Sequence, residues 1–131
     1  ELQNIGAEPI NLNLVRFTKG IKIEFPNMTL NAGDYVLVVK DINAFQDAYG
    51  HDLNIAGQYV GSLANGGERL RLEDALGESI LDFRYNDWIK STDGGGFSLE
   101  VINPTETDPD SWNLKDAWRA SALYGGSPGW N

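Results

Sequence analysis

The chain contains no cysteine, so it can form neither a disulfide bond nor a thiolate metal site, and it has a single histidine, His51. A metal site with several histidines is therefore excluded, and a Ser-His-Asp triad would depend on His51 alone. We expect His51, just after a predicted helix, to cap that helix or to face water. No apolar run approaches the roughly 20 residues that a membrane helix needs, so no membrane insertion is expected.

Basic residues are also scarce. Ten lysine and arginine residues stand against 19 acidic residues, which gives a formal net charge of −9. Binding to a nucleic acid duplex needs clustered cations that displace counterions, so this composition argues against nucleic acid as a partner. The chain also has no nucleophile elbow and no phosphate-binding loop. We therefore expect a protein that is not an enzyme and needs no cofactor.

The hydrophobic residues that are present suffice for one domain. The chain has 131 residues, of which 41% are hydrophobic and 11% aromatic, and these values are typical of a folded chain with a single core. We expect one domain over residues 1–131. The chain opens on Glu1-Leu2 without a methionine, and we interpret it as a piece excised from a longer protein.

Short alternating segments separated by turns predict an all-β fold. Apolar and polar residues alternate over residues 10–14, 21–25 and 97–101, and residues 35–39 read as a strand buried on both faces. The alternation changes parity near Leu14 and Val15, which predicts a bulge or a break. One short helix is expected over residues 43–49, with Asn43 as its N-cap and Gly50 just past its end. Residues 57–67 read as turns.

Residues 68–85 carry the clearest hairpin signal. Residues 68–73 alternate strictly, residues 74–77 form a turn in which Gly77 supplies the left-handed position, and residues 79–85 return. Leu70 and Leu72 should face apolar residues of the second strand. The charged residues should lie outside; these are Arg69, Arg71, Asp82 and Arg84.

Several residues are expected to have structural roles. We expect the indole of Trp118 to fill the core or close one end of the sandwich, with its N–H bonded to a backbone carbonyl. Ser121 should satisfy nearby backbone groups. Two turns complete the set, and their residues are Asn65 and Gly66 in the first and Asp93, Gly94 and Gly96 in the second.

Two weaker patterns indicate binding. Trp88 and Trp112 fall in predicted loops, where exposed rings beside Asp and Asn could stack on sugars. Asp108 and Asp110 place two carboxylates on one loop and could hold calcium, although the alternating ligands of an EF-hand are absent. The competing interpretations are a tryptophan folded over the end of the sandwich and a solvated acidic loop.

Eight segments form an ordered pattern, and they are residues 1–4, 10–14, 30–38, 61–72, 82–88, 93–100, 118–121 and 126–131. Their order resembles the lamin-tail domain family, and its bacterial branch more than the nuclear lamins. The resemblance spans essentially the whole chain and implies an immunoglobulin-like antiparallel β-sandwich that lacks the first strand of the family.

The resemblance implies a non-catalytic accessory module of a bacterial secreted or cell-surface protein, which mediates protein interaction, adhesion or spacing. Its expected location is extracellular or at the cell surface, and its expected partner is a protein or a cell-surface polymer. No catalytic residues belong to the family pattern. A carbohydrate-binding module using Trp88 and Trp112 is one alternative. A lamin-like scaffold or DNA-associated domain is another, which the acidic charge disfavours. The sequence carries no signal for the oligomeric state.

Overall fold

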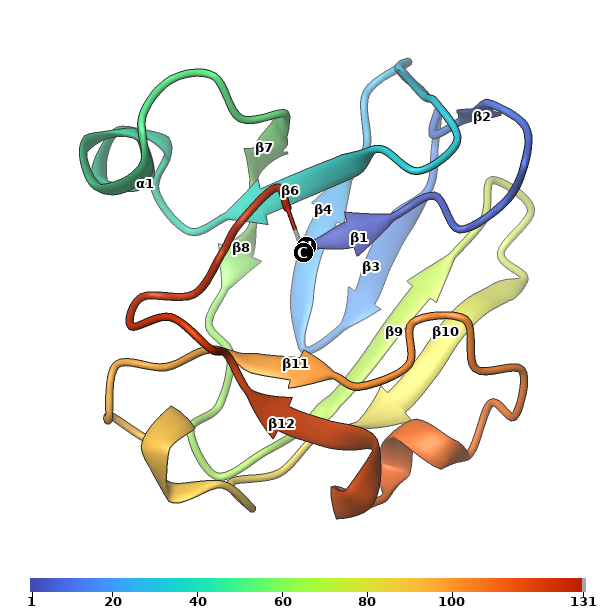
Figure 1. The fold of residues 1–131 in the computed structure, drawn as a ribbon. Coiled ribbons are helices and arrows are strands. Elements are labelled where there is room, and N and C mark those ends of the chain that lie inside the picture. Colours follow the sequence, from blue (N-terminus) through green and yellow to red (C-terminus); the bar gives the residue numbers. More distant parts are fainter. Residues whose placement is uncertain (131) are drawn as a thin grey trace.

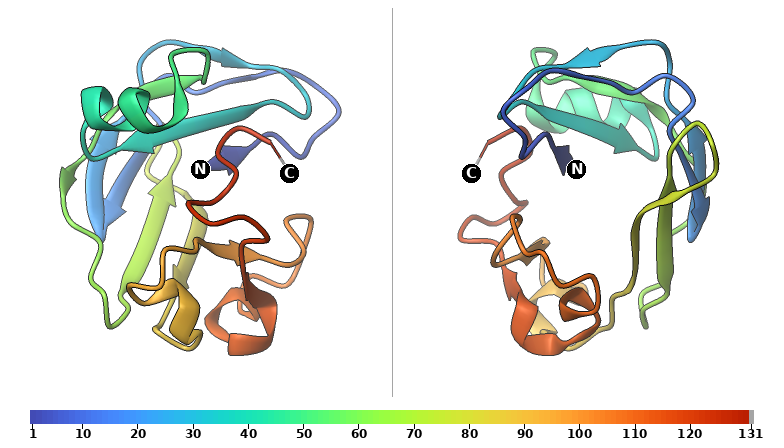
Figure 2. Two further views of the ribbon diagram at one scale, coloured as in Figure 1. Left: turned by 60° about the vertical axis from the view of Figure 1, so that its left-hand side comes forward. Right: turned by 90° about the vertical axis from the view of Figure 1, so that its right-hand side faces the viewer.

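The structure is a computed structural model that describes residues 1–130. Within these residues, short strands form one five-stranded, one three-stranded and two two-stranded sheets, accompanied by one short α-helix and three 3₁₀-helices. The prediction of an all-β fold with one short helix is confirmed. Figure 2 shows the five-stranded sheet as one wall, with the three-stranded sheet above and the C-terminal strands across from it.

The five-stranded sheet has the order β10-β9-β3-β4-β8, and all its neighbouring strands are antiparallel (Figure 1). Its strands are β3 (Arg16–Lys19), β4 (Ile21–Glu24), β8 (Val60–Gly61), β9 (Arg69–Glu73) and β10 (Ser79–Arg84). The β9–β10 hairpin is the one predicted from the sequence. Its register sets Leu72 opposite Leu81 and Leu70 opposite Phe83, and Gly77 takes a left-handed φ of 83° in the turn.

The three-stranded sheet has the order β1-β6-β7 and contains β1 (Leu2–Gln3), β6 (Tyr35–Val39) and β7 (Ile55–Gln58). β6 and β7 run parallel, a pairing that the sequence analysis did not anticipate. Parallel neighbours need a crossover connection, and α1 (Ile42–Tyr49) lies within it. Residues 57–67 were predicted as turns, but they also contain the end of β7 and the whole of β8.

The remaining elements form two small sheets and three 3₁₀-helices. β2 (Ile10–Asn11) pairs with β5 (Thr29–Leu30), and β11 (Leu99–Val101) pairs with β12 (Trp118–Ala120). The 3₁₀-helices are η1 (Lys90–Thr92), η2 (Ser111–Asn113) and η3 (Lys115–Ala117). Residues near the two ends of the described chain are in contact, since the Glu1 carboxylate accepts a hydrogen bond from the Gly129 N–H.

The N-cap of the helix differs from the prediction. Asp41, not Asn43, caps α1, because Asp41 has an extended backbone and its Oδ1 accepts the Ala44 N–H at 2.9 Å. Asn43 lies inside the first turn and is exposed. The predicted end is confirmed, since the Gly50 N–H donates to the Gln46 carbonyl and Gly50 adopts a φ of 90°.

The core lies between the sheets. Its main cluster consists of six buried hydrophobic residues, Leu12, Val15, Phe25, Leu30, Val36 and Leu72. The predicted break in alternation explains how two of them reach it. Leu14 adopts a left-handed φ of 64° and is exposed, so Leu12 and Val15 on either side of it both point inward.

A side-chain contact fixes the turn between β8 and β9. The Tyr85 hydroxyl donates to the Ala64 carbonyl at 2.6 Å, and the Glu68 carboxylate accepts the Ala64 N–H at 2.6 Å. Burial and the neighbouring Glu68 carboxylate raise the pKa of Tyr85 to about 12. The position that requires glycine here is Gly67, which has a φ of 97°, whereas Gly66 has open space around it.

The two adjacent glycines give a matched test of this turn. A Cβ on Gly67 would meet the Tyr85 carbonyl in a backbone conformation unfavourable for alanine, so we expect Gly67→Ala to lower the free energy of unfolding by about 1–3 kcal/mol. Gly66→Ala should change it by less than about 0.5 kcal/mol. Urea unfolding followed by tryptophan fluorescence measures both values. Equal effects of the two substitutions would contradict the described turn.

Candidate interaction surface

The outer face of the five-stranded sheet carries most of the basic residues of the chain. Leu72 is 4% exposed and sets the inward direction for β9, since it pairs with Phe17 on β3 and Leu81 on β10. Successive residues of a strand point to opposite faces, so the residues on either side of an inward one point outward. Lys19 reaches the outer face through the register shift between Phe17 and Lys19, which sets it opposite Arg71. The charged residues of the outer face are Arg16, Lys19, Lys22, Glu24, Arg69, Arg71, Glu73, Asp82 and Arg84.

Two carboxylates organise the arginines of this face. Asp82 accepts two hydrogen bonds from Arg69, at 2.7 and 2.6 Å, and a third from Arg71 at 3.3 Å. Glu73 accepts a hydrogen bond from Arg71 at 2.9 Å and lies 3.4 Å from the Arg16 guanidinium. The ion pairs therefore form one continuous network across β3, β9 and β10.

The network changes the protonation of its members. Hydrogen bonds from Arg69, together with the positive charges of Arg69 and Arg71, lower the pKa of Asp82 against the opposing effect of burial. The hydrogen bond to Asp82 raises the pKa of Arg69 above its ordinary value. Asp82 therefore stays ionised to a lower pH than an isolated aspartate does.

Charge is segregated between this face and the rest of the chain. Six of the ten basic residues but only three of the 19 acidic residues lie on the outer face. The rest of the sequence holds four basic and sixteen acidic residues. The net charge of −9 is thus the sum of a face with excess positive charge and a strongly acidic remainder.

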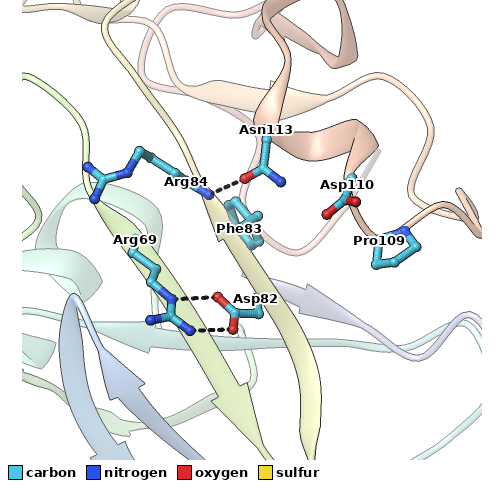
Figure 3. Close-up of a pocket in the computed structure, with 7 residues that line it drawn as sticks. All are labelled: Arg69, Asp82, Phe83, Arg84, Pro109, Asp110 and Asn113. Carbon is cyan, nitrogen blue, oxygen red and sulfur yellow. Dashed lines mark hydrogen bonds and ion pairs between the residues drawn. The ribbon is translucent and has the colours of Figure 1, made fainter.

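A first shallow hollow, of about 380 Å³, lies where this face meets the loop before β12 (Figure 3). Arg69, Asp82, Phe83 and Arg84 line it from the sheet, and Pro109, Asp110 and Asn113 line it from the loop. The Arg84 backbone N–H points away from β9 and donates to the Asn113 side-chain oxygen at 2.8 Å. This bond fixes the loop against the edge of β10.

An aromatic cluster supports the loop side of the hollow. Phe83 meets the Trp112 ring edge-on, with centroids 5.5 Å apart, and its centroid is also 5.5 Å from that of Trp118. The Trp118 indole N–H donates to the Trp112 carbonyl at 2.8 Å, so the predicted bond to a backbone carbonyl is confirmed. Trp118 is half-buried in this cluster and is not part of the six-residue main core.

A second hollow, of about 440 Å³, lies over the β3–β4 hairpin on the same sheet. Its lining includes the outward residues Arg16, Thr18, Lys22 and Glu24, with parts of Phe17 and Ile23. The two hollows lie toward opposite sides of the sheet, one beside β10 and one on β3 and β4. Both are bordered by basic side chains.

The structure does not bring the predicted sugar-stacking residues together. Trp112 pairs with Phe83 and Trp118, and Trp88 is half-buried. The exposed aromatic residues of the described chain are instead Tyr49, Tyr124 and Trp130. The C-terminal segment carries two of them, and the Tyr49 hydroxyl donates to the Gly125 carbonyl beside Tyr124.

The predicted calcium ligands have other contacts. The Asp108 side chain accepts the Asp110 N–H at 3.0 Å, and the Asp108 carbonyl accepts the Ser111 N–H, as in a turn. Asp110 lines the first hollow. Among residues 1–130 no group of three or more His, Cys, Asp or Glu side chains could hold a metal ion, and calcium binding at Asp108 and Asp110 stays a prediction.

The remaining predicted residues lie in turns and at strand ends. Ser121 is buried, and its hydroxyl accepts the Ser98 N–H at 3.0 Å and donates to the Leu123 carbonyl at 2.8 Å, as predicted. In the turn at 93–96, the Asp93 N–H donates to the Lys90 carbonyl. Gly94 and Gly96 adopt left-handed φ values of 76° and 83°, and Gly96 lies under the Tyr124 ring. His51 is exposed, and Asn65 is an exposed residue of its turn.

Comparison of this chain with models of protein families, with curated proteins and with solved structures finds no match. None of the helices described in residues 1–130 combines the length and apolar character needed to cross a bilayer.

The lowered pKa of Asp82 makes the ion-pair network testable by pH. The folded-state pKa of Asp82 lies below its unfolded value of about 3.9, so its stabilisation is full above about pH 5 and is lost as the pH falls through the folded-state pKa. We expect Asp82→Asn to lower the urea midpoint at pH 7 and to differ less from the parent protein near pH 2.5.

Asp87→Asn serves as the control for this experiment, because Asp87 is exposed and has no described ion pair. It should leave the urea midpoint unchanged at both pH values. A difference between Asp82→Asn and the parent protein that stays constant with pH would argue against the described role of Asp82.

Proposed function

We propose that this chain is a non-catalytic module that binds another protein. We further propose that it belongs to the lamin-tail family, has an immunoglobulin-like sandwich fold, and works outside the cell or at the surface of a bacterium as part of a larger protein. The resemblance of the sequence to that family motivates the family, the fold type and the location. The choice of a protein partner comes from the candidate interaction surface.

The observation that carries the proposal is the form of the outer face of the five-stranded sheet. It offers two shallow hollows on one sheet face, with arginines held in place by carboxylates and apolar surface at Pro109. Protein interfaces combine such apolar contacts with fixed arginines, and arginine is enriched among the residues that carry binding energy. Small-molecule sites are typically enclosed, whereas these hollows are open to solvent.

Carbohydrate binding is the second candidate, and one observation favours it. Tyr124 is 79% exposed and Trp130 is 56% exposed, so two rings of the C-terminal segment present apolar faces to water. Rings with an apolar body and a polar tip suit surfaces that are partly wet. This candidate uses different residues from the Trp88 and Trp112 of the sequence prediction.

Three binding and activity measurements on the purified domain test the proposal. We expect selection from a phage-displayed peptide library to give peptides that bind the folded domain and are displaced by soluble domain. We expect no signal on a glycan array and no turnover of chromogenic hydrolase substrates above buffer. Glycan binding that Tyr124→Ala and Trp130→Ala remove would favour the second candidate instead, and turnover would contradict a non-catalytic role.

A further inference from the structure

The hollows on the outer face lie at the ends of a row of cations. At one end of the row, Lys22 on β4 lines the second hollow. Lys19 on β3 and Arg71 on β9 lie opposite each other in the middle. At the other end, Arg69 on β9 and Arg84 on β10 lie opposite each other and line the first hollow. With neighbouring strands about 4.8 Å apart, the row from β4 to β10 spans about 14 Å. Asp82 lies within this row and is occupied by Arg69 and Arg71, and Glu24 lines the second hollow together with Lys22.

The arginines of the row keep hydrogen-bonding capacity for a ligand. A guanidinium has five N–H donors, and the described bonds of Arg71 to Glu73 and Asp82 engage two of them. Because carboxylates hold Arg69 and Arg71 in place, less side-chain entropy is lost when a ligand binds. Lys22 and Arg84, one in each hollow, have no ion pair among the contacts described for residues 1–130.

The hollows indicate what kind of anion fits. Pro109 gives the first hollow an apolar part, and the aliphatic stems of Arg16 and Lys22 do so for the second, where Phe17 and Ile23 turn their side chains to the opposite face of the sheet. A nucleic acid duplex or an acidic polysaccharide would bring charge but no apolar side chain to fill them. An extended peptide brings both, since its side chains alternate and it rises about 3.3 Å per residue. About five residues would span the row.

We propose that the outer face of the five-stranded sheet binds an extended acidic peptide segment of a partner protein, with carboxylates at Lys22 and Arg84 and apolar side chains in the two hollows. This inference rests on the proposed protein-binding function and names its surface and partner chemistry. Asp110 lines the loop side of the first hollow and would repel a carboxylate of the ligand, so that carboxylate lies on the sheet side of the hollow, at Arg84.

Charge-reversal variants test this surface. The probe is a labelled peptide of about 12 residues in which glutamate alternates with leucine or serine, and its matched control has glutamine for every glutamate. We expect the glutamate peptide to bind by fluorescence anisotropy and the glutamine peptide to bind much more weakly. Lys22→Glu combined with Arg84→Glu should weaken binding about tenfold or more, and added salt should weaken it further.

Lys90→Glu combined with Lys115→Glu makes the same charge change outside both hollows and should weaken binding far less. Circular dichroism of both double variants establishes that they fold. Equal weakening by the two double variants, equal binding of the glutamine peptide, or no binding of the glutamate peptide would each overturn the inference. So would tighter binding of heparin or of a DNA duplex at this face.

The outcome also separates this inference from the function on which it rests. The binding of peptides selected from the phage library is then measured on the Lys22→Glu and Arg84→Glu double variant. If they bind it as tightly as the parent domain, the protein-binding function stands and the proposed surface is wrong. If the library gives no binding peptides and the glutamate peptide does not bind, both proposals fail.

Discussion

Burial of one face of the five-stranded sheet determines what its other face can be. Leu72 is almost completely buried between Phe17 and Leu81, and Leu70 lies opposite Phe83. A shift of one residue in β9 would bury arginines and expose leucines, so the hydrophobic pattern fixes the register. The same pattern then places Arg69 and Arg71 outside, where Asp82 and Glu73 meet them. The basic face is therefore a direct consequence of the core.

The β10 edge of this sheet is partly covered by a loop. β10 is a terminal strand with a register irregularity between Ser79 and Leu81. At its other end, Asn113 accepts the Arg84 N–H, and the loop that carries Asn113 is fixed by the contacts of Trp112 with Phe83. Irregularities and covering loops are devices that keep edge strands from pairing with other chains. The loop that protects the edge also forms one side of the first hollow.

The sequence predicted the features that depend on local pattern and failed where distant segments meet. The β9–β10 hairpin, the break at Leu14 and the glycine at the end of α1 follow from alternation and turn chemistry alone. β7 and β8 were missed because short strands gain their hydrogen bonds from partners far along the chain. The hollow beside β10 could not be predicted, since a contact over 29 residues, from Arg84 to Asn113, creates it. Its arginines were predicted to lie outside, and a count of charges by face would have indicated the basic surface.

The chain has a net charge of −9, whereas its outer sheet face has excess positive charge, so an acidic partner experiences different forces at long range and at contact. At physiological ionic strength the Debye length is about 8 Å, so a ligand in contact with the outer face responds mainly to the charges of that face. At longer range an acidic partner meets a molecule of net charge −9 and is not attracted to it. Long-range steering therefore does not accelerate association, and affinity must come from slow dissociation. Slow dissociation depends on shape and fixed hydrogen-bond donors, which here are the hollows and the arginines held by Asp82 and Glu73.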